Sequence, residues 1–464
     1  MFHNIKKYTL FFAGALALTA CTTELDVKPA NSVKEELVFV NTATSKSSLK
    51  AMVTGLYDML SDGDVASGSL RNAELLPLEG ETQWRGTFTG LREIARQAIT
   101  TPNDDVANFW LDSYQTIHAS NQVIENLNLL TSDAEKRSYE GQALFIRSLA
   151  TFQLIRFFTE PYDATTANDA NSGIPLVSKT TDFAAVVNGS LQVSRNTMNE
   201  SYNFVINDLI KAISLLPTSN GFFATSHAAN ALLARVYLQK GDFTNAATTA
   251  SRVIASGAFR LSNNYSDAFG RTTNSQEDVF AVQITSQDGI NDKGANAMVT
   301  FFQNRTFGGR GDVRILARHL NLYETGDARK DLFAKERSAD TWWFCGKWTN
   351  PVAQNINIIR LAEMYLIRAE ANFMANTAVG DSPLNDINVI RNRAKLPSLT
   401  SVDLNAIKKE RKLELAFEGH RIHDIRRWKE NAGAMKFDNP KLTFPIPQRE
   451  MDVNTKMIQN IGYR

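Results

Sequence analysis

The sequence predicts a mainly α-helical protein: a divergent tetratricopeptide-like scaffold of helical repeats with an irregular, loop-rich region and a few short strands. Two observations support this fold class. Apolar residues recur at steps of three and four over most of the chain, as on the buried face of a helix. The pattern stops between residues 258 and 350, where Gly, Asn, Thr and Phe are frequent. Long irregular segments in compact proteins are usually functional, so we expect the binding region there.

The first twenty residues predict a signal peptide. Lys6 and Lys7 precede the apolar run TLFFAGALALTA, whose twelve residues are too few to cross a bilayer but suit a secretory signal. The run ends in LTAC, which resembles a bacterial lipobox, in which Cys21 would be lipidated and begin the mature chain. An ordinary signal peptide with a chance Cys is the alternative. The expected division is signal peptide 1–20, lipidated tether 21–44 and a single folded unit 45–464.

Composition limits the function classes and the means of stabilisation. The chain has 50 Lys and Arg against 49 Asp and Glu, which argues against a broad nucleic-acid surface. No later stretch is long and apolar enough to span a membrane, so we expect a folded body on a lipid anchor. If Cys21 is lipidated, Cys345 is the only other thiol and no internal disulfide can form. The core alone must then stabilise the fold.

Helical patterns fill the N-terminal part, 45–257. The first begins at about residue 45, and the others cover 104–130, 133–159 and 195–216. The run AANALLARVYLQKGDFTNAATTASRVIASG then predicts two helices joined by a KGDF turn, with Ala246, Ala247 and Ala250 permitting close approach. This arrangement is typical of a tetratricopeptide repeat, and an ordinary helical hairpin is the alternative.

The remaining chain divides into the irregular insertion 258–350 and a C-terminal helical part, 351–464. Within the insertion, DVFAVQIT predicts a strand because it is short, apolar and rich in β-branched residues. In the C-terminal part, the segments 358–375 and 384–394 repeat the helix-pair pattern. Strict 34-residue self-similarity is absent, so the repeats are divergent.

The run RKLELAFEGHRIHDIRRW, residues 411–428, superficially resembles an active site. Glu410, Glu414 and Glu418 lie four apart, so on a helix they share one face, whereas glycosidase carboxylates flank the scissile bond from two sides. Its two histidines are three apart and do not match the zinc-protease spacing. We therefore expect neither catalysis nor a bound metal here.

A structural interpretation fits this run better. From Glu410 to Glu430 there are five acids and six bases, a near-balance that allows mutual pairing. An apolar stripe is formed by Leu413, Ala416, Phe417 and His420. Gly419 can bend or break the helix, and Asp424 could hold His420 or Arg427. The segment is predicted to stabilise the scaffold, and a partner contact is the alternative.

Tryptophans in loops are the candidate ligand contacts. Trp84, with its neighbour Arg85, lies in GETQWRGTFTG, and Trp342 and Trp343 lie in the irregular insertion. Indole rings offer flat apolar faces to the C–H faces of sugars, while nearby polar groups bind hydroxyls. Burial of these rings in loop cores is the alternative. We expect these four residues to contact the ligand.

Several motifs occur in an order that resembles one known family. They are GQALFIRSLATFQLIRFF followed by GIPLV, RNTMNESYNFVINDLIKAISLLP, DAR at 327–329, IIRLAEMYLIRAEA, LNDINVIRNRA, ERKLELAFEGHRIHDIRRW and LTFPIPQREMDVN. Together with the mature start ELDVKPANSV, they are similar to the SusD/RagB family of outer-membrane lipoproteins of Bacteroidetes. The resemblance extends over nearly the whole mature chain.

The resemblance implies a non-enzymatic lipoprotein of the outer membrane that needs no cofactor. It would bind oligosaccharides at the cell surface and deliver them to a SusC-type TonB-dependent transporter. A peptide-binding RagB-like member, or a transporter lid without its own ligand site, is the alternative; a glycosidase is the enzymatic alternative. In carbohydrate-binding members, ligand aromatics come from a loop after the first helix and from the irregular middle region. Trp84 and the Trp342–Trp343 pair match by region, not residue by residue.

Overall fold

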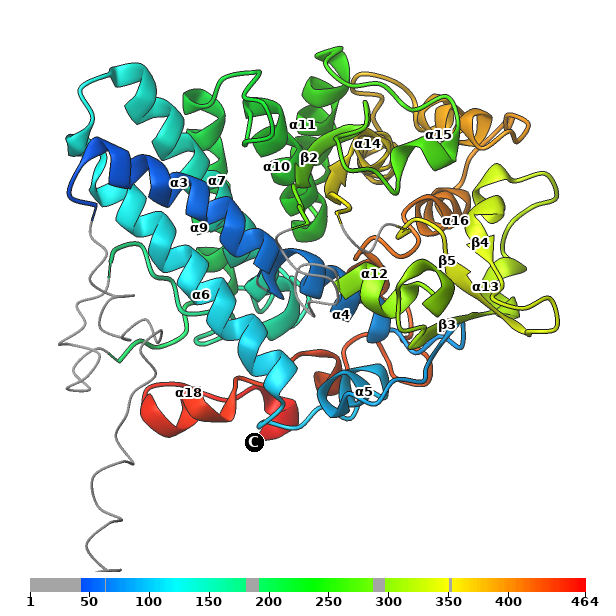
Figure 1. Ribbon diagram of the computed structural model, residues 1–464, viewed down its shortest axis with the longest axis horizontal. Coiled ribbons are helices and arrows are strands. Elements are labelled where there is room, and N and C mark those ends of the chain that lie inside the picture. The colour runs from blue at the N-terminus through cyan, green and yellow to red at the C-terminus, as the bar shows by residue number, and fades with distance from the viewer. Residues whose placement is uncertain (1–42, 63, 181–191, 287–296, 350–352) are drawn as a thin grey trace, which may run out of the picture. The chain divides into compact units, whose positions relative to one another are not determined.

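The computed structural model describes residues 43–62, 64–180, 192–286, 297–349 and 353–464. Ala43–Arg464 forms one compact unit (Figure 1). The predicted lipidation site, Cys21, lies outside the described residues. The N-terminal part is built from helices: α3 Lys46–Asp62, α4 Ser69–Leu75, α5 Thr89–Ala95, α6 Asp104–Glu125, α7 Asp133–Phe158, α9 Met198–Leu215, α10 Ser226–Lys240 and α11 Phe243–Ala255.

Helix boundaries follow from capping residues in the sequence. Thr197 and Glu200 form a capping box at the start of α9, where each side chain accepts a backbone N–H. Asn103 and Ser132 cap α6 and α7 in the same way with single hydrogen bonds. The KGDF turn ends α10 at Gly241, whose φ of 79° lies in the left-handed region that glycine adopts without strain.

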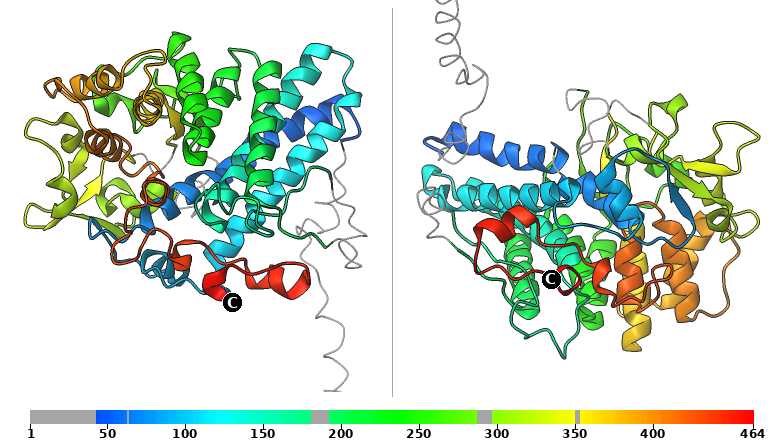
Figure 2. Two further views of the ribbon diagram at one scale, coloured as in Figure 1. Left: turned by 180° about the vertical axis from the view of Figure 1, so that it is seen from behind. Right: turned by 90° about the horizontal axis from the view of Figure 1, so that it is seen from below.

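The helices pack as consecutive antiparallel neighbours (Figures 1 and 2). α7 packs on α9, α9 on α10, α10 on α11, and α11 on the C-terminal helix α14, Leu361–Ala375. Ala246, Ala247 and Ala250 of α11 are fully buried, as predicted for a close helix–helix contact. The mainly helical, repeat-like scaffold expected from the sequence is confirmed.

The insertion is more regular than its composition suggested. Its elements are β2 Asp278–Val282, α12 Ala297–Phe302, β3 Val313–Leu316, α13 Ala317–Leu320, β4 Phe333–Ala334 and β5 Trp342–Cys345. The predicted strand at DVFAVQIT is confirmed as β2. Short turns of π or 3₁₀ helix also occur: η1 Asp64–Gly68, η2 Leu127–Leu129, η3 Tyr265–Ala268, η4 Arg305–Phe307, η5 Ala328–Leu332, η6 Pro440–Leu442 and η7 Ile461–Tyr463.

The C-terminal part continues the helical scaffold. Its remaining elements are β6 Ile356–Arg360, α15 Pro383–Arg393, α16 Leu404–Glu414, α17 Arg421–Arg427 and α18 Gln448–Val453. The helix expected from residue 358 begins only at Leu361. The preceding residues form β6 because their β-branched side chains suit a buried strand, which pairs antiparallel with β2. A four-stranded antiparallel sheet has the order β1-β3-β5-β4, where β1 is Thr82–Trp84.

The charged run 411–428 does not form one continuous helix. α16 ends at Glu414 and α17 begins at Arg421, and between them Phe417 and Gly419 have φ values of 62° and 81°. Gly419 lies against α4, where an added Cβ would come 2.3 Å from Leu70 Cδ2. The predicted break at Gly419 is therefore confirmed. Glu418, however, lies beyond the helix, so the expected single stripe of three glutamates is wrong.

Candidate functional site

The four-stranded sheet joins the candidate binding residues from distant parts of the sequence. β1 carries Trp84 and pairs with β3, and β3 pairs with β5, which carries Trp342 and Trp343. The backbone N–H of Arg85 extends this pairing by donating to Asp312 O at 2.6 Å. Residues more than 200 positions apart in sequence thus lie on adjacent or next-adjacent strands.

Two of the predicted residues face the core. Trp84 lies opposite Val313 and Trp343 lies opposite Ile315, and both of these β3 residues are fully buried. The Trp84 ring centre is 5.7 Å from that of buried Phe301. The Trp343 ring also packs partly on the core. Both rings are half-buried, so a large share of their area serves packing.

The other two predicted residues lie on the opposite side of the sheet. We call this side the arginine–tryptophan face; its members are Gln83, Arg85, Arg314, Leu316 and Trp342. Strand alternation and the pairings Gln83–Arg314 and Leu316–Trp342 place them together. Gln83 and Arg85 are exposed, and the other three are half-buried. This face therefore offers both an indole ring and cationic groups to a ligand.

Arg314 also belongs to this face, although the sequence did not indicate it as a binding residue. Its guanidinium carbon lies 3.8 Å from the centre of the Trp342 ring, a cation–π contact. The segment VRIL alternates buried and half-buried residues, so its period-two pattern could have placed Arg314 on an outer face. Its pairing with a strand 28 residues later could not be read from that pattern.

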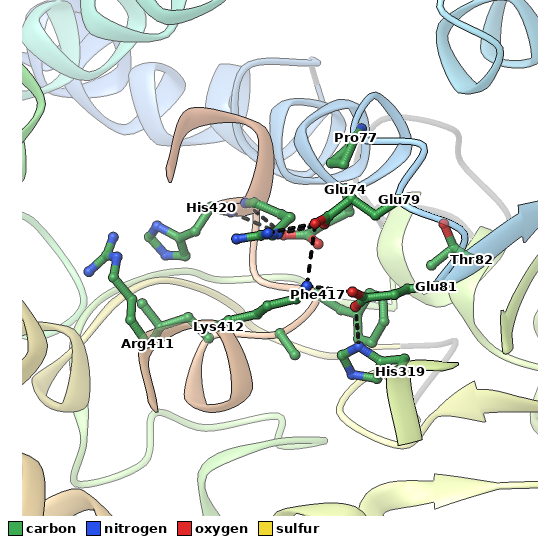
Figure 3. A pocket seen from close by; sticks show the side chains of 13 residues that line it. Glu74, Pro77, Glu79, Glu81, Thr82, His319, Arg411, Lys412, Phe417 and His420 are labelled. Carbon is green, nitrogen blue, oxygen red and sulfur yellow. Dashed lines mark hydrogen bonds and ion pairs between the residues drawn. The ribbon is translucent and has the colours of Figure 1, made fainter. Parts of the chain in front are cut away.

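A hollow beneath β1 shows how the sheet is attached to residues 410–430, which we call the charged segment (Figure 3). Glu79 binds Arg421 at 2.6 Å, and Glu81 binds both Lys412 and His319. The hollow leaves only about 30 Å³ of free space, enough for one or two water molecules but not for a sugar ring. These ion pairs fix the strand that carries Trp84.

The charges around Glu81 alter its protonation. Burial by itself would raise the pKa of Glu81, but the hydrogen bond with His319 and the charge of Lys412 outweigh it and lower the pKa to about 2. Burial lowers the pKa of His319 below its usual value despite the nearby carboxylate. His319 Nδ1 lies 2.8 Å from Glu81 Oε2, so a neutral His319 can donate a hydrogen bond to an ionised Glu81.

The glutamates of the charged segment are bound by basic residues from other elements. Buried Arg360 donates to Glu277 at 2.8 Å, to Glu418 at 2.7 Å and to Glu414 at 3.2 Å. Lys347 contacts Glu418 at 2.6 Å. The expectation that acids and bases within the segment would mainly pair with each other is therefore wrong for these glutamates. Asp424 does pair within the segment, with Arg411 and with Arg427, one of its two expected partners.

Protonation of this cluster does not suit acid–base catalysis at neutral pH. Burial by itself would raise the pKa of Glu414, but Arg393, Arg360 and Arg329 outweigh it and lower the pKa to about 2. Both histidines of the segment, His420 and His423, are buried, and burial lowers their pKa well below 6.5. A general acid needs a pKa near the working pH, which Glu414 does not have.

The DAR motif has a comparable structural explanation. Asp327 accepts a hydrogen bond from the backbone N–H of Arg329 and pairs with its guanidinium at 2.7 Å. Arg329 also donates to Glu410 at 2.9 Å. All three side chains are essentially inaccessible to solvent. The motif thus joins the irregular insertion to α16.

A second, larger hollow of about 230 Å³ lies between the α9–α10 loop and β2. Phe222, Phe223 and Phe259 line it together with polar Asn274 and Asp278. Burial raises the pKa of Asp278 to about 6. No candidate binding residue from the sequence lies there, because isolated Phe residues in turns gave no pattern.

The described part of the chain has neither a cluster of metal-ligating side chains nor a helix that could span a membrane. Within residues 43–62, 64–180, 192–286, 297–349 and 353–464, no group of three or more His, Cys, Asp or Glu side chains could hold a metal ion. In the same ranges, no helix has both the length and the apolar content needed to cross a bilayer.

Two family models together match nearly the whole chain. One, described as starch-binding and associating with the outer membrane, matches residues 25–238. The other, described as the SusD family, matches residues 242–463. The chain belongs to the SusD/RagB family. The resemblance inferred from the motifs is therefore confirmed.

Similar SusD-family proteins include curated relatives and solved structures. The SusD-like protein P2 of Formosa agariphila is 26% identical over 98% of this chain and 99% of its own. The starch-binding protein SusD of Bacteroides thetaiotaomicron is 25% identical over 72% of this chain and 74% of its own. A crystal structure described as a putative sugar-binding protein from Bacteroides vulgatus has a TM-score of 0.80 and 26% identity, covering 91% of this chain and all of that one.

Proposed function

We propose that this SusD/RagB protein is a lipid-anchored, glycan-binding protein of the outer-membrane surface that passes oligosaccharides to a SusC-type TonB-dependent transporter. The observation that carries the proposal is the arginine–tryptophan face, where Trp342 and two arginines lie on one side of a sheet. Aromatic rings and hydrogen-bond donors on one surface suit sugars, which have apolar C–H faces and polar edges. Half-buried Trp84 and Trp343 lie on the same strands but face the other side of the sheet.

The relatives support a binding role. The matched SusD is named as a starch-binding protein, and a SusD-like structure of the same fold is described as laminarin-binding. The carboxylates of the charged segment are buried in ion pairs, which argues against the glycosidase alternative. We therefore propose that the protein binds its ligand without cleaving it.

The test is calorimetry of the mature protein against panels of oligosaccharides and peptides. We expect saturable glycan binding that weakens about five- to thirtyfold in Trp342→Ala, since loss of a stacked ring costs on the order of 1–2 kcal/mol. Phe373→Ala is the matched control, because Phe373 is 37% exposed at the end of α14, away from the sheet. Thermal unfolding checks that each variant keeps its fold.

Other outcomes identify the alternatives. Loss of glycan binding in Phe222→Ala, but not in Trp342→Ala, would move the site to the second hollow. Binding of peptides but of no glycan would select the RagB-like alternative. If no ligand binds, yet the protein co-purifies with a transporter of the outer membrane, the lid alternative is correct. Turnover of labelled oligosaccharide would disprove the non-enzymatic assignment.

A further inference from the structure

The stacking of Arg314 on Trp342 changes what the arginine–tryptophan face offers to a ligand. With the guanidinium carbon 3.8 Å from the ring centre, one face of the indole is covered by the arginine. A guanidinium stacked in this way keeps N–H groups at its edge, which can bind a carboxylate or sulfate with two parallel hydrogen bonds. The exposed feature on that side of the ring is therefore a cation.

Among the described residues, no anion pairs with this cation. In the part of the sequence that the structure describes, neither Arg314 nor Arg85 forms an ion pair, and the buried Nε of Arg314 has no hydrogen-bond partner. The nearby acids are already paired: Asp312 binds Arg310 at 2.9 Å, and Glu79 and Glu81 bind the charged segment. Within the described ranges, the two positive charges on this face thus have no opposite charge.

Other arginines that are shielded from water pair with carboxylates of this protein. Arg147, Arg235 and Arg368 each pair with a carboxylate at 2.7 Å or less. Shielding a charged group from water without a partner is unfavourable, so an unpaired half-buried arginine points to a partner outside the chain. The partner that would satisfy Arg314 must carry negative charge.

The register of the sheet spaces these groups for an extended ligand. Arg314 lies directly opposite Gln83, so Arg85 and Trp342 are its diagonal neighbours on the two flanking strands. Diagonal neighbours on one face are about 7–8 Å apart at Cα, within reach of long side chains. A chain of sugar units crossing the strands could therefore contact the indole and both guanidinium groups at once.

We infer that the arginine–tryptophan face binds oligosaccharides bearing negative charge, as carboxylate or sulfate-ester groups. This inference rests on the proposed glycan-binding function. Arg314 and Arg85 bind the anionic groups, and the free surface of Trp342 contacts the sugar ring that carries them. Lys335, the residue after β4, is not part of this face, because its ammonium group lies over the Trp343 ring, 4.8 Å from the ring centre, on the other side of the sheet.

The test compares chemically matched ligands on the mature protein. One pair is an oligouronate and its carboxyl-reduced, neutral counterpart; the other is a sulfated oligosaccharide and its desulfated counterpart. We expect the charged member of at least one pair to bind about tenfold more tightly or better, with the difference shrinking as salt is raised. Which pair shows the difference identifies carboxylate or sulfate as the recognised group.

Variants test the residues. Arg314→Gln should lower the affinity for the charged ligand about tenfold and leave the neutral ligand nearly unchanged, and Arg85→Gln should act in the same direction more weakly. Arg314→Lys, which keeps the charge but not the planar fork, should retain part of the affinity. Arg252→Gln is the matched control, because Arg252 is exposed on α11, away from the sheet.

Two results would overturn the inference in distinguishable ways. Equal affinity for charged and neutral glycans, unaffected by Arg314→Gln, would reject the anionic specificity and leave glycan binding intact. Binding of neither member of any pair, with a folded protein, would reject the glycan-binding function as well.

Discussion

Arg360 illustrates why charged residues in this protein are so deeply buried. It is only 2% exposed, and its guanidinium donates hydrogen bonds to three glutamates. Desolvation of one arginine is offset only because several carboxylates surround it, and those carboxylates in turn depend on other basic residues. The main effect of the cluster is therefore to specify which elements pack together. Its net contribution to stability is smaller.

Replacing Arg360 tests whether the buried glutamates depend on it. We expect Arg360→Met to lower the free energy of unfolding by about 3–5 kcal/mol, because it leaves buried carboxylates without their partner. Lys46→Met is the control: Lys46 also binds a glutamate at 2.8 Å, but its side chain is 55% exposed, so a change within about 0.5 kcal/mol is expected. Urea denaturation measures both. If both variants lost the same free energy of unfolding, burial would not explain the effect of Arg360.

Buried His423 should make the free energy of unfolding depend on pH. Burial, followed by the charges of Arg156, Arg426 and Arg235, lowers its pKa well below 6.5. Below pH 6.5 the unfolded chain takes up a proton that the folded protein does not, so this residue's contribution to stability falls with decreasing pH. Its Nε2 has no partner among the described residues, and its ring packs on Phe157.

We therefore expect His423→Phe to keep or raise stability at pH 7.5. Between pH 6.5 and 5, its free energy of unfolding should fall less steeply than that of the wild type, by up to about 1.4 kcal/mol per pH unit. Denaturation curves at several pH values measure the slope. Parallel slopes for the two proteins would show that His423 is not held neutral.

At the same scale, residue types predicted the site only in part. A tryptophan in a loop suggested a ligand contact, but nothing in its local sequence distinguished Trp342 from Trp343. Adjacent strand residues face opposite sides, so the sheet sends one ring toward the face that carries Arg314 and the other toward the core. Arg314 itself gained its significance only through its cross-strand neighbours.

At the scale of elements, the break between α16 and α17 shows how one glycine directs the chain. Gly419 combines a φ of 81° with close contact to α4, where its added Cβ would approach Leu70 Cα to 2.8 Å. The backbone N–H of Gly419 also donates to Glu74 at 2.8 Å. A side chain at this position would be both strained and too large.

Two glycine substitutions can separate these effects. Gly241 has nearly the same φ, 79°, but nothing lies within 4 Å of an added Cβ. Gly241→Ala should therefore cost about 1–2 kcal/mol for the left-handed backbone alone. Gly419→Ala should cost more, about 3 kcal/mol or above, because α4 must also move. If thermal or urea unfolding showed similar losses of unfolding free energy for the two variants, α4 would be able to move aside at little cost.

The long elements were predictable and the short strands were not. α6 and α7 run for 22 and 26 residues, so their apolar repeat is sampled over many turns. β1, β3, β4 and β5 have only two to four residues each, too few for a periodic signal. Their existence depends on pairing with partners far away in the chain.

At the scale of the whole molecule, the charged segment connects distant parts of the chain. Its backbone binds Glu74 of α4, its glutamates bind Arg329 and Lys347 of the insertion, and Arg426 donates to Thr159 O after α7. The stretch that resembled an active site is thus a common attachment point for the N-terminal helices, the insertion and the C-terminal part.

The proposed lipid anchor gives a prediction for the whole protein. The Cys21→Ala variant is expressed in a Gram-negative host. We expect it to lose palmitate labelling and to appear in the soluble fraction instead of the membrane fraction. Cys345→Ala is the matched control: Cys345 is fully buried on β5, so that variant should remain labelled and membrane-bound. Continued labelling of Cys21→Ala would disprove the lipobox interpretation.

The sequence by itself determined the helical scaffold and the family, and it predicted a structural role for the charged segment. These rest on local periodicity, capping residues and the order of motifs, which act over a few residues at a time. Only the tertiary structure decided which ring of the tryptophan pair turns outward, that Arg314 stacks on it, and which arginines bind the buried glutamates. Each of these depends on strand register or on contacts between elements distant in sequence, and no local pattern encodes such contacts.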